Sequence, residues 1–438
     1  MADDLVRSAT RKAARRLIPF LFLCYTINFL DRVNVGFAAL AMNEDIGLSP
    51  AIFGAGAGIF FVGYLLFEIP SNLALQKFGA RVWIARIMIS WGIVAMAMAL
   101  VAGPTSFYVM RFLLGVAEAG FFPGIILYLT YWFPMAERAR IVSLFMAAVP
   151  IATVVGAPVS GALLEMHGIA GLAGWQWMFI IEGLPAVLLG FVALRFLTDR
   201  PADATWLTQA ERAALAAKLA AEAEATRATG YAGLGEALIR PRVLVLALLY
   251  FCIVVGLYGI GFWMPQVIQT FGLDPLAIGF LTAVPYLFAS IVMVLAGTSS
   301  DRSGERTLHV AVPLLIGAAA FAWSATAGSL VAAMVALTFA TAGIYAAIGT
   351  FWSFPTAILT GTAAAAGLAF VNATGNLGGL LGPTVIGILK EETGSFASAM
   401  VFLAGAMACG GVIALMFGWW GAPRTTLRKS ARAIRKSP

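Results

Sequence analysis

Residues 297–306 read GTSSDRSGER, a short polar loop between two apolar runs, and this stretch decides the fold because its core occurs twice. The segment RSGER at 302–306 matches KFGAR at 77–81 with an offset of 225 residues. The same offset relates Pro158 in one apolar run to Pro383 in another. A constant offset between similar segments indicates that the chain consists of two duplicated halves.

The composition of the chain places both halves in a membrane. Of the 438 residues, 61% are hydrophobic and 11% are charged, and the mean hydropathy is +0.92. Soluble domains carry about 25% charged residues, so a soluble fold of this length is excluded. Runs of about 20 apolar residues, each able to span a bilayer, recur throughout. The sequence therefore predicts an all-α polytopic membrane protein with twelve transmembrane helices in two pseudo-symmetric six-helix bundles.

The twelve predicted spans divide the chain into four regions. We expect spans near residues 17–40, 51–75, 82–102, 105–133, 139–164, 175–197, 242–271, 276–299, 307–326, 329–358, 362–389 and 396–420. The regions are an N-terminal six-helix bundle (1–197), a cytoplasmic linker (198–241), a C-terminal six-helix bundle (242–420) and a basic cytoplasmic tail (421–438). In the linker, Thr208-x-x-Glu211 is a capping-box pattern that predicts a polar surface helix.

Basic residues are distributed unevenly between the two sides of the membrane. Most of the 28 Lys and Arg residues lie in connections on the side of both termini and the linker, and the opposite connections hold only Lys390. The positive-inside rule places the basic side in the cytoplasm. We therefore expect an integral protein of the inner (plasma) membrane with both termini cytoplasmic. Orientation accounts for the net charge of +7, so a nucleic-acid partner is not needed.

The sequence offers few groups for metal or covalent chemistry. It contains two His and three Cys, and it has no HExxH, P-loop or GxSxG pattern. Cys24, Cys252 and Cys409 all lie in apolar runs and are expected to be small packing residues. We expect no metal and no cofactor, and a membrane-embedded enzyme is the least favoured of the functional hypotheses.

Ionisable residues within the spans concentrate in the N-terminal half. Asp31, Arg32, Glu68, Arg111 and Glu118 lie inside spans, and the positions 225 residues later hold Gly, Leu, Met, Ala and Gly. Each buried ionisable group costs about 2.5–3.5 kcal/mol to insert. Because the equivalent positions of the other half carry no charge, these five residues favour a binding site over a structural role.

Glu68 and two further ionisable positions are open to a structural interpretation. Glu68 lies near the end of its span and precedes Pro70, so a structural role and a functional role are equally consistent with its position. Arg86 and Glu182 lie near span ends, where long side chains reach the interface, and we expect structural roles for both.

Helix geometry relates the charged residues to one another. Arg111 and Glu118 are two turns apart on one helix face, about 10 Å along the axis. Asn28 and Arg32 are one turn apart on the first span. Asp31 and Arg111 fall at similar depths, which permits an ion pair between the first and fourth spans. That pair would leave Arg32 unpaired and facing the cavity.

The residue types suggest the chemistry of this cavity. An unpaired guanidinium in a low-dielectric cavity is a bidentate receptor for a carboxylate. Proton coupling needs a group that changes its charge, and neither of the two histidines lies deep within a span. Glu118 is the best candidate for that group, and Asp31 is the second.

The repeated loop resembles the loop motif of the major facilitator superfamily. The first copy departs from the motif, because Gln76-Lys77 replaces Asp-Arg. The resemblance implies two bundles that expose a central site alternately to either side. It also implies a gating loop in each half, with the charged members Lys77, Arg81, Asp301, Arg302 and Arg306.

Longer motifs resemble the anion:cation symporter family, most closely its bacterial tartrate and phthalate branch. They are LDRVN at 30–34, GYLLFEIPSN at 63–72, RFLLGVAEAG at 111–120, GWQWMF at 174–179, FWSFP at 351–355 and NATGNLGG at 372–379. The resemblance implies that Asp31 pairs with Arg111 and that Glu118 couples protons. Arg32, Tyr64, Trp352, Asn376 and Asn28 would contact substrate, and Tyr258, Trp263 and Gln266 either line the pocket or serve packing.

The predicted function is secondary active import of a small organic anion by proton symport. The anion would be a tartrate-like hydroxy-dicarboxylate, a sugar acid or a phthalate-like aromatic carboxylate. An exporter, exchanger or facilitator of the same fold is the alternative. The expected partners are the organic anion, protons and the lipid bilayer, and we expect the chain to function as a monomer.

Overall fold

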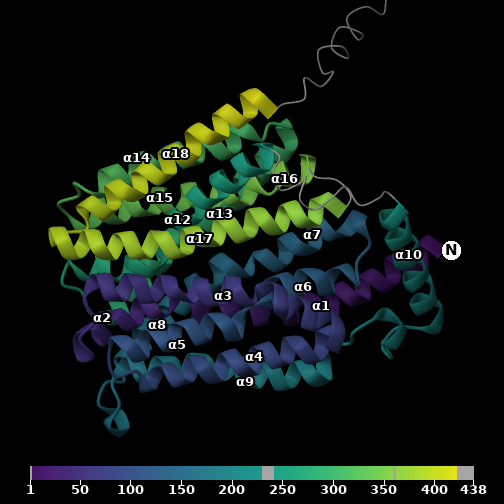
Figure 1. The fold of residues 1–438 in the computed structure, drawn as a ribbon, viewed down its shortest axis with the longest axis horizontal. Helices are drawn as coiled ribbons and strands as arrows, with labels where there is room; N and C mark the ends of the chain where they lie inside the picture. Colours follow the sequence, from purple (N-terminus) through teal and green to yellow (C-terminus); the bar gives the residue numbers. More distant parts are fainter. Residues whose placement is uncertain (1, 229–240, 359–361, 422–438) are drawn as a thin grey trace, which may run out of the picture.

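A computed structural model describes residues 2–228, 241–358 and 362–421, and every regular element within these ranges is a helix (Figure 1). The first half contains α1 (Ala2–Val33), α2 (Val35–Asp45), α3 (Pro50–Phe78), α4 (Ala80–Ala97), α5 (Pro104–Glu118), α6 (Phe121–Thr130), α7 (Met135–Met146), α8 (Ala148–Leu164) and α9 (Gly174–Phe196). The linker contains α10 (Gln209–Ala228). The second half contains α12 (Pro241–Gln269), α13 (Pro275–Ser303), α14 (Thr307–Ser324), α15 (Leu330–Phe351), α16 (Ser353–Ile358), α17 (Thr362–Thr393) and α18 (Ala397–Gly421).

Three short 3-10 helices complete the described elements: η1 (Met98–Leu100), η2 (Ile169–Gly171) and η3 (Pro201–Asp203). The end of the predicted linker and nearly all of the predicted basic tail, 421–438, lie outside the described residues.

The predicted membrane spans are present as helices. Within the described ranges, eleven helical segments are long and apolar enough to cross a membrane. The remaining predicted span, 362–389, coincides with α17, which has 32 residues and carries Asn372 and Asn376. Four spans consist of two consecutive helices each: α1 with α2, α5 with α6, α7 with α8, and α15 with α16. The prediction of an all-α polytopic membrane fold is confirmed.

The duplication is visible in the way equivalent helices begin. Helices α3 and α13 both have 29 residues, both start with proline, and start 225 residues apart. The Ser49 hydroxyl accepts from the Ile52 amide (3.3 Å), and the Asp274 carboxylate accepts from the Ala277 amide (2.8 Å). The capping side chain accepts a hydrogen bond from an otherwise unpaired amide of the first turn, and proline at the next position has no amide hydrogen that needs a partner. Both helices therefore begin in the same way.

The two halves meet mainly along two helix pairs, α3 with α17 and α8 with α13, and α2 also packs against α12. Figure 1 shows α17 running alongside α3. A methyl group on Gly54 would overlap the carbonyl of Pro383, and one on Gly387 would overlap the carbonyl of Pro50. Glycines at such crossings let helix backbones approach closely. These contacts close the end of the bundle that lies away from the N-terminus.

The linker helix α10 is anchored to the start of α1. Glu211 accepts hydrogen bonds from Lys12 (2.9 Å), from the Ser8 hydroxyl (2.7 Å) and from the Thr208 amide (2.9 Å). The Thr208 hydroxyl accepts from the Glu211 amide in return (3.3 Å), so the predicted capping box is confirmed. Lys12 and the Ser8 hydroxyl together lower the pKa of Glu211 to about 2.

Candidate functional site

A buried ion pair lies at the interface between the two halves. Arg32 on α1 donates one Nη to Glu118 on α5 and the other to the hydroxyl of Tyr258 on α12 (2.9 Å). Glu118 is fully buried, and Arg32 is 7% exposed. The rings of Phe60 and Tyr64 on α3 both lie 5.3 Å from the guanidinium carbon. Aromatic faces at this distance stabilise a desolvated cation, so four helices contribute to the environment of Arg32.

A break in the fourth span ends α5 at Glu118. Ala119 has an extended conformation (φ −53°, ψ 132°), and Gly120 is left-handed (φ +84°) before α6 begins at Phe121. A methyl group on Gly120 would overlap the Ser71 side chain. Glycine is therefore required here both by its backbone conformation and by its close contact with α3. The sequence Glu118-Ala119-Gly120 thus places the carboxylate at a helix end.

The predicted ion pair between Asp31 and Arg111 is not formed. Asp31 accepts from the indole of Trp91 on α4 (2.7 Å), and Arg111 donates to two backbone carbonyls of α3 (3.2 and 3.3 Å). The prediction that Arg32 is unpaired is also wrong, because Glu118 occupies it. Consecutive helical residues point about 100° apart, so α1 turns Asp31 toward α4 and Arg32 toward α5. Similar depth in the membrane does not ensure that two side chains face each other.

Several buried polar atoms near the ion pair have no hydrogen-bond partner among the described residues. They include both amide atoms of Asn28, one oxygen of Asp31 and one oxygen of Glu118. Asn28 is fully buried and precedes Arg32 by one helical turn. An unsatisfied buried polar group costs about 1–3 kcal/mol, and native structures retain few of them. The carboxylate oxygens can take up a proton or accept a hydrogen bond from a ligand, and the Asn28 amide can donate one and accept another.

Trp352 and Asn376 lie in the second half, near Tyr250 of α12. The Trp352 ring packs against the rings of Tyr250 (4.9 Å) and Phe351 (5.4 Å). Tyr250 also lies directly against Gly375, the neighbour of Asn376 on α17. Asn376 is half-buried. A substrate role for Trp352 and Asn376 stays a prediction.

Glu68 provides a second carboxylate near the interface of the halves. It interacts with the side chain of Asn372 on α17, and it lies within electrostatic range of Arg32. Glu182, in contrast, accepts from Asn34 (2.9 Å) and Ser160 (2.7 Å) within the first half.

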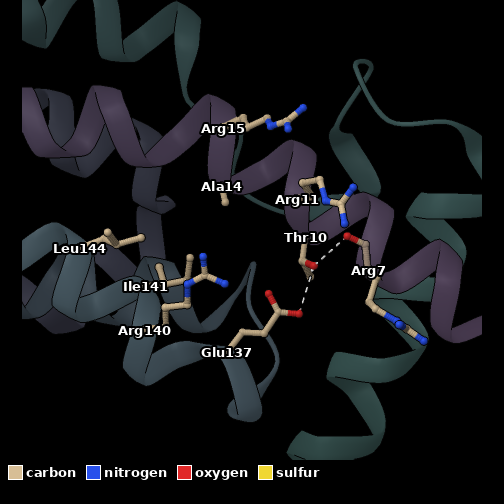
Figure 2. A pocket seen from close by; sticks show the side chains of 9 residues that line it. All are labelled: Arg7, Thr10, Arg11, Ala14, Arg15, Glu137, Arg140, Ile141 and Leu144. Carbon is tan, nitrogen blue, oxygen red and sulfur yellow. Dashed lines mark hydrogen bonds between the residues drawn. The ribbon is translucent and has the colours of Figure 1, made fainter. Parts of the chain in front are cut away.

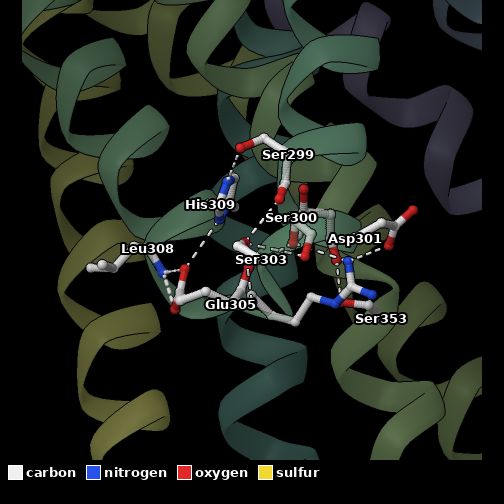
Figure 3. Close-up of polar contacts among 10 residues, drawn as sticks. Ser299, Ser300, Asp301, Ser303, Glu305, Leu308, His309 and Ser353 are labelled. Carbon is white, nitrogen blue, oxygen red and sulfur yellow. Dashed lines mark hydrogen bonds and ion pairs between the residues drawn. The ribbon is translucent and has the colours of Figure 1, made fainter.

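The two predicted gating loops use different carboxylates. In the second half, Arg306 donates to Asp301 (2.5 Å) and to the hydroxyl of Ser300 (3.0 Å). Figure 3 shows the two acceptor residues, Asp301 and Ser300. In the first half, which lacks the motif aspartate, the Arg81 amide donates to Asp199 (2.8 Å). Asp199 follows α9, so a residue outside the motif supplies the missing charge. Lys77 lies against the ring of Phe78, and Arg302 is exposed.

Of the candidates Tyr258, Trp263 and Gln266 on α12, Tyr258 lies at the ion pair. Tyr258 accepts from Arg32, whereas Trp263 donates to the carbonyl of Pro383 (3.2 Å). Gln266 accepts from Asn43, on α2, at 3.5 Å. Two residues of the site were not predicted: Phe60, although it lies one turn from Tyr64, and Trp91, because an indole gives no charge signal.

Comparisons with known proteins agree with this fold. The profile described as Major Facilitator Superfamily matches residues 21–383. The chain is 54% identical over 416 residues to a protein of Agrobacterium vitis named "Putative tartrate transporter", covering 95% of this chain and 92% of the relative. It is 43% identical over 408 residues to a quinolone resistance transporter of Acinetobacter baumannii, covering 93% of each chain.

A solved structure supports the same assignment at the level of fold. The inward-facing, unoccupied structure of a bacterial homologue of the human lysosomal transporter Spinster has a TM-score of 0.72 at 20% identity. The alignment covers 93% of this chain and 95% of that chain. By its sequence profile, its relatives and its fold, the protein is a membrane transporter that belongs to the Major Facilitator Superfamily.

Proposed function

We propose that this transporter imports a small organic anion together with protons. The observation that carries the proposal is the ion pair between Arg32 and Glu118. While Glu118 is ionised, it occupies the guanidinium that a substrate carboxylate would need. A proton on Glu118 removes its charge and leaves Arg32 to bind the anion bidentately. Anion and proton therefore bind together, which is the requirement for symport.

The surroundings of Arg32 favour a hydroxylated or aromatic carboxylate. The hydroxyl of Tyr258 and the unpartnered amide of Asn28 supply hydrogen-bonding groups beside the guanidinium, and the Tyr64 ring supplies an aromatic face. The name of the Agrobacterium vitis relative supports a tartrate-like hydroxy-dicarboxylate. A sugar acid would use the hydrogen-bonding groups, and a phthalate-like carboxylate would use the aromatic face.

The membrane potential sets a minimum number of protons that must enter with each anion. It opposes entry of each negative charge by about 2.3 kcal/mol per 100 mV. Uptake of a dianion therefore calls for about two protons or more in each cycle. Glu118 carries one of them, and Asp31 and Glu68 are the other carboxylates of the first half near this site.

The proposal includes a place and an orientation for the protein. The excess of basic residues in the connections on one side supports a cytoplasmic location for both termini and α10, in a cell whose inner membrane holds the transporter. The halves 1–197 and 242–420 would rock about the interface, with Arg81–Asp199 and Arg306–Asp301 holding the cytoplasmic loops. One chain contains the whole site, so a monomer suffices.

Uptake into proteoliposomes tests the proposal. The purified full chain is reconstituted, and radiolabelled tartrate is offered with and without an inward proton gradient. We expect accumulation above equilibrium only with the gradient, together with proton entry. The same assay is run with a sugar acid and with phthalate. Equilibration without accumulation for every anion at every gradient would contradict proton symport.

A second candidate function is export of hydrophobic compounds. The quinolone resistance transporter of Acinetobacter baumannii, 43% identical to this chain, favours it. In that case, expression of this protein would lower the quinolone content of loaded cells in a gradient-dependent manner. Our proposal predicts no change in quinolone content.

A further inference from the structure

A pocket of about 530 Å³ lies between the first turns of α1 and α7, far along α1 from the ion pair (Figure 2). Arginines dominate its lining: Arg7, Arg11 and Arg15 come from α1, and Arg140 comes from α7. Glu137 is the one carboxylate of the lining, and it already accepts a hydrogen bond from Thr10 (3.1 Å). The pocket therefore has a clear excess of positive charge.

Three of the four pocket arginines differ from the neighbouring cations of α1 in having no partner, and the fourth, Arg7, lies 3.5 Å from the Asp4 carboxylate. Lys12 pairs with Glu211 on α10 (2.7 Å). Arg16 lies over the ring of Phe196, 4.6 Å from its centre. Within the described ranges, Arg11, Arg15 and Arg140 have neither a carboxylate nor an aromatic ring in contact, and all three are exposed. Their charge is available to an external anion.

The same pocket borders the apolar surface that faces lipid. Leu144, part of the lining, is 49% exposed, and Ile151, Val155 and Val159 are also exposed. These residues follow one another at spacings of seven and four, which places them on a single face of the continuous α7–α8 span. Exposed apolar side chains on a transmembrane helix contact acyl chains. Arg140 precedes Leu144 by one turn on this face.

We propose that the pocket binds the phosphate headgroup of an anionic phospholipid from the adjoining leaflet. Arg11, Arg15 and Arg140 would contact the phosphate, and an acyl chain would lie along Leu144 and Ile151. Basic pockets between transmembrane helices bind such headgroups on the cytoplasmic side, and each nearby Lys or Arg contributes about 1 kcal/mol. A free phosphate would use the arginines but gain nothing from the apolar stripe.

Native mass spectrometry of the full chain in detergent tests this site. Phosphatidylglycerol or phosphatidylcholine is titrated into wild type, the double variant Arg11→Gln/Arg140→Gln, and the matched control Arg212→Gln/Lys218→Gln on α10. We expect wild type and control to retain phosphatidylglycerol in preference to phosphatidylcholine. The pocket variant should bind phosphatidylglycerol at least tenfold more weakly, and phosphatidylcholine unchanged.

A comparison with inorganic phosphate and a second variant distinguish lipid binding from phosphate binding and from a failure to fold. Inorganic phosphate at the same concentration should not raise the thermal unfolding midpoint, whereas phosphatidylglycerol should raise it in wild type and not in the pocket variant. If the double variant does not fold, the single variant Arg15→Gln replaces it, with a weaker loss expected. Equal phosphatidylglycerol binding by variant and wild type, or equal stabilisation by inorganic phosphate, would overturn the proposal.

Discussion

Arg32 and Glu118 stand 86 positions apart in the chain, yet they form a buried ion pair that joins α1 to α5. Arg32 also donates to Tyr258 of the opposite half, so one guanidinium links the charge of Glu118 to the contact between the halves. Removing one partner of a buried pair costs about 3–5 kcal/mol, because the remaining charge is left uncompensated. Protonation of Glu118 therefore favours the arrival of another anion at Arg32.

The planar guanidinium of Arg32 should be essential for substrate affinity. In Arg32→Lys, a single ammonium replaces a fork that can hold two carboxylate oxygens, so we expect tartrate affinity to fall by about tenfold or more. Isothermal titration calorimetry measures the change. Arg86→Lys is the control, since Arg86 lies against the Trp83 ring at 4.8 Å and is remote from the ion pair. Unchanged affinity in Arg32→Lys would remove this residue from the site.

The hydrogen bond from Trp91 to Asp31 should contribute to stability. Trp91→Phe removes the donor and leaves a buried carboxyl without its partner, at a cost of about 1.5–3 kcal/mol. The thermal unfolding midpoint of the purified protein should fall accordingly. In an Asp31→Asn background, the same substitution should cost less, which isolates the bond as a double-mutant cycle. Equal losses in both backgrounds would show that only the packing of the indole matters.

Glu391 at the end of α17 should help to close the far end of the bundle. It accepts from the Ser49 hydroxyl (2.6 Å) and from the Ala51 amide (2.8 Å) of the opposite half, and these bonds lower the pKa of Glu391 below its ordinary value of 4.5. The bonds of Glu391 to Ser49 and Ala51 therefore contribute fully to closure above pH 4.5. This contribution is lost as the pH falls through the lowered pKa of Glu391. Glu391→Ala should mimic low pH.

Spin-label distances measure this closure. Labels at Glu44→Cys and Glu392→Cys, in a background without the native cysteines, report on the separation of α2 and α17. Glu391→Ala at pH 7 should increase the share of long distances several-fold. Asp274→Asn is the control, because Asp274 caps α13 within its own half. A distance distribution unchanged by Glu391→Ala would exclude this role.

The sequence predicted the spans well because their signals are local. A capping residue followed by proline, as in Ser49-Pro50, marks a helix start, and long apolar runs mark the membrane. The capping box at Thr208 was predictable for the same reason. The break at Ala119–Gly120 was not predicted, because a left-handed residue inside an apolar run depends on the contact with Ser71 of another helix.

Which residues belong to the site was easier to predict from the sequence than which of them pair with each other. The asymmetry between the halves singled out Arg32 and Glu118, which the structure brings together. The pairing of Asp31 with Arg111 failed because it depends on how each helix is rotated, and depth alone does not determine rotation. Asp31 accepts instead from the indole of Trp91, a neutral donor that no pattern of charged residues reveals.

The most direct test of the coupling mechanism is gradient-driven uptake by Glu118→Gln in proteoliposomes. Glu182→Gln is the matched control, because Glu182 is also a buried carboxyl of the first half but bonds to Asn34 and Ser160 instead of Arg32. We predict that Glu118→Gln exchanges tartrate across the membrane but no longer accumulates it, while Glu182→Gln accumulates it as wild type does. Normal accumulation by Glu118→Gln would contradict the account.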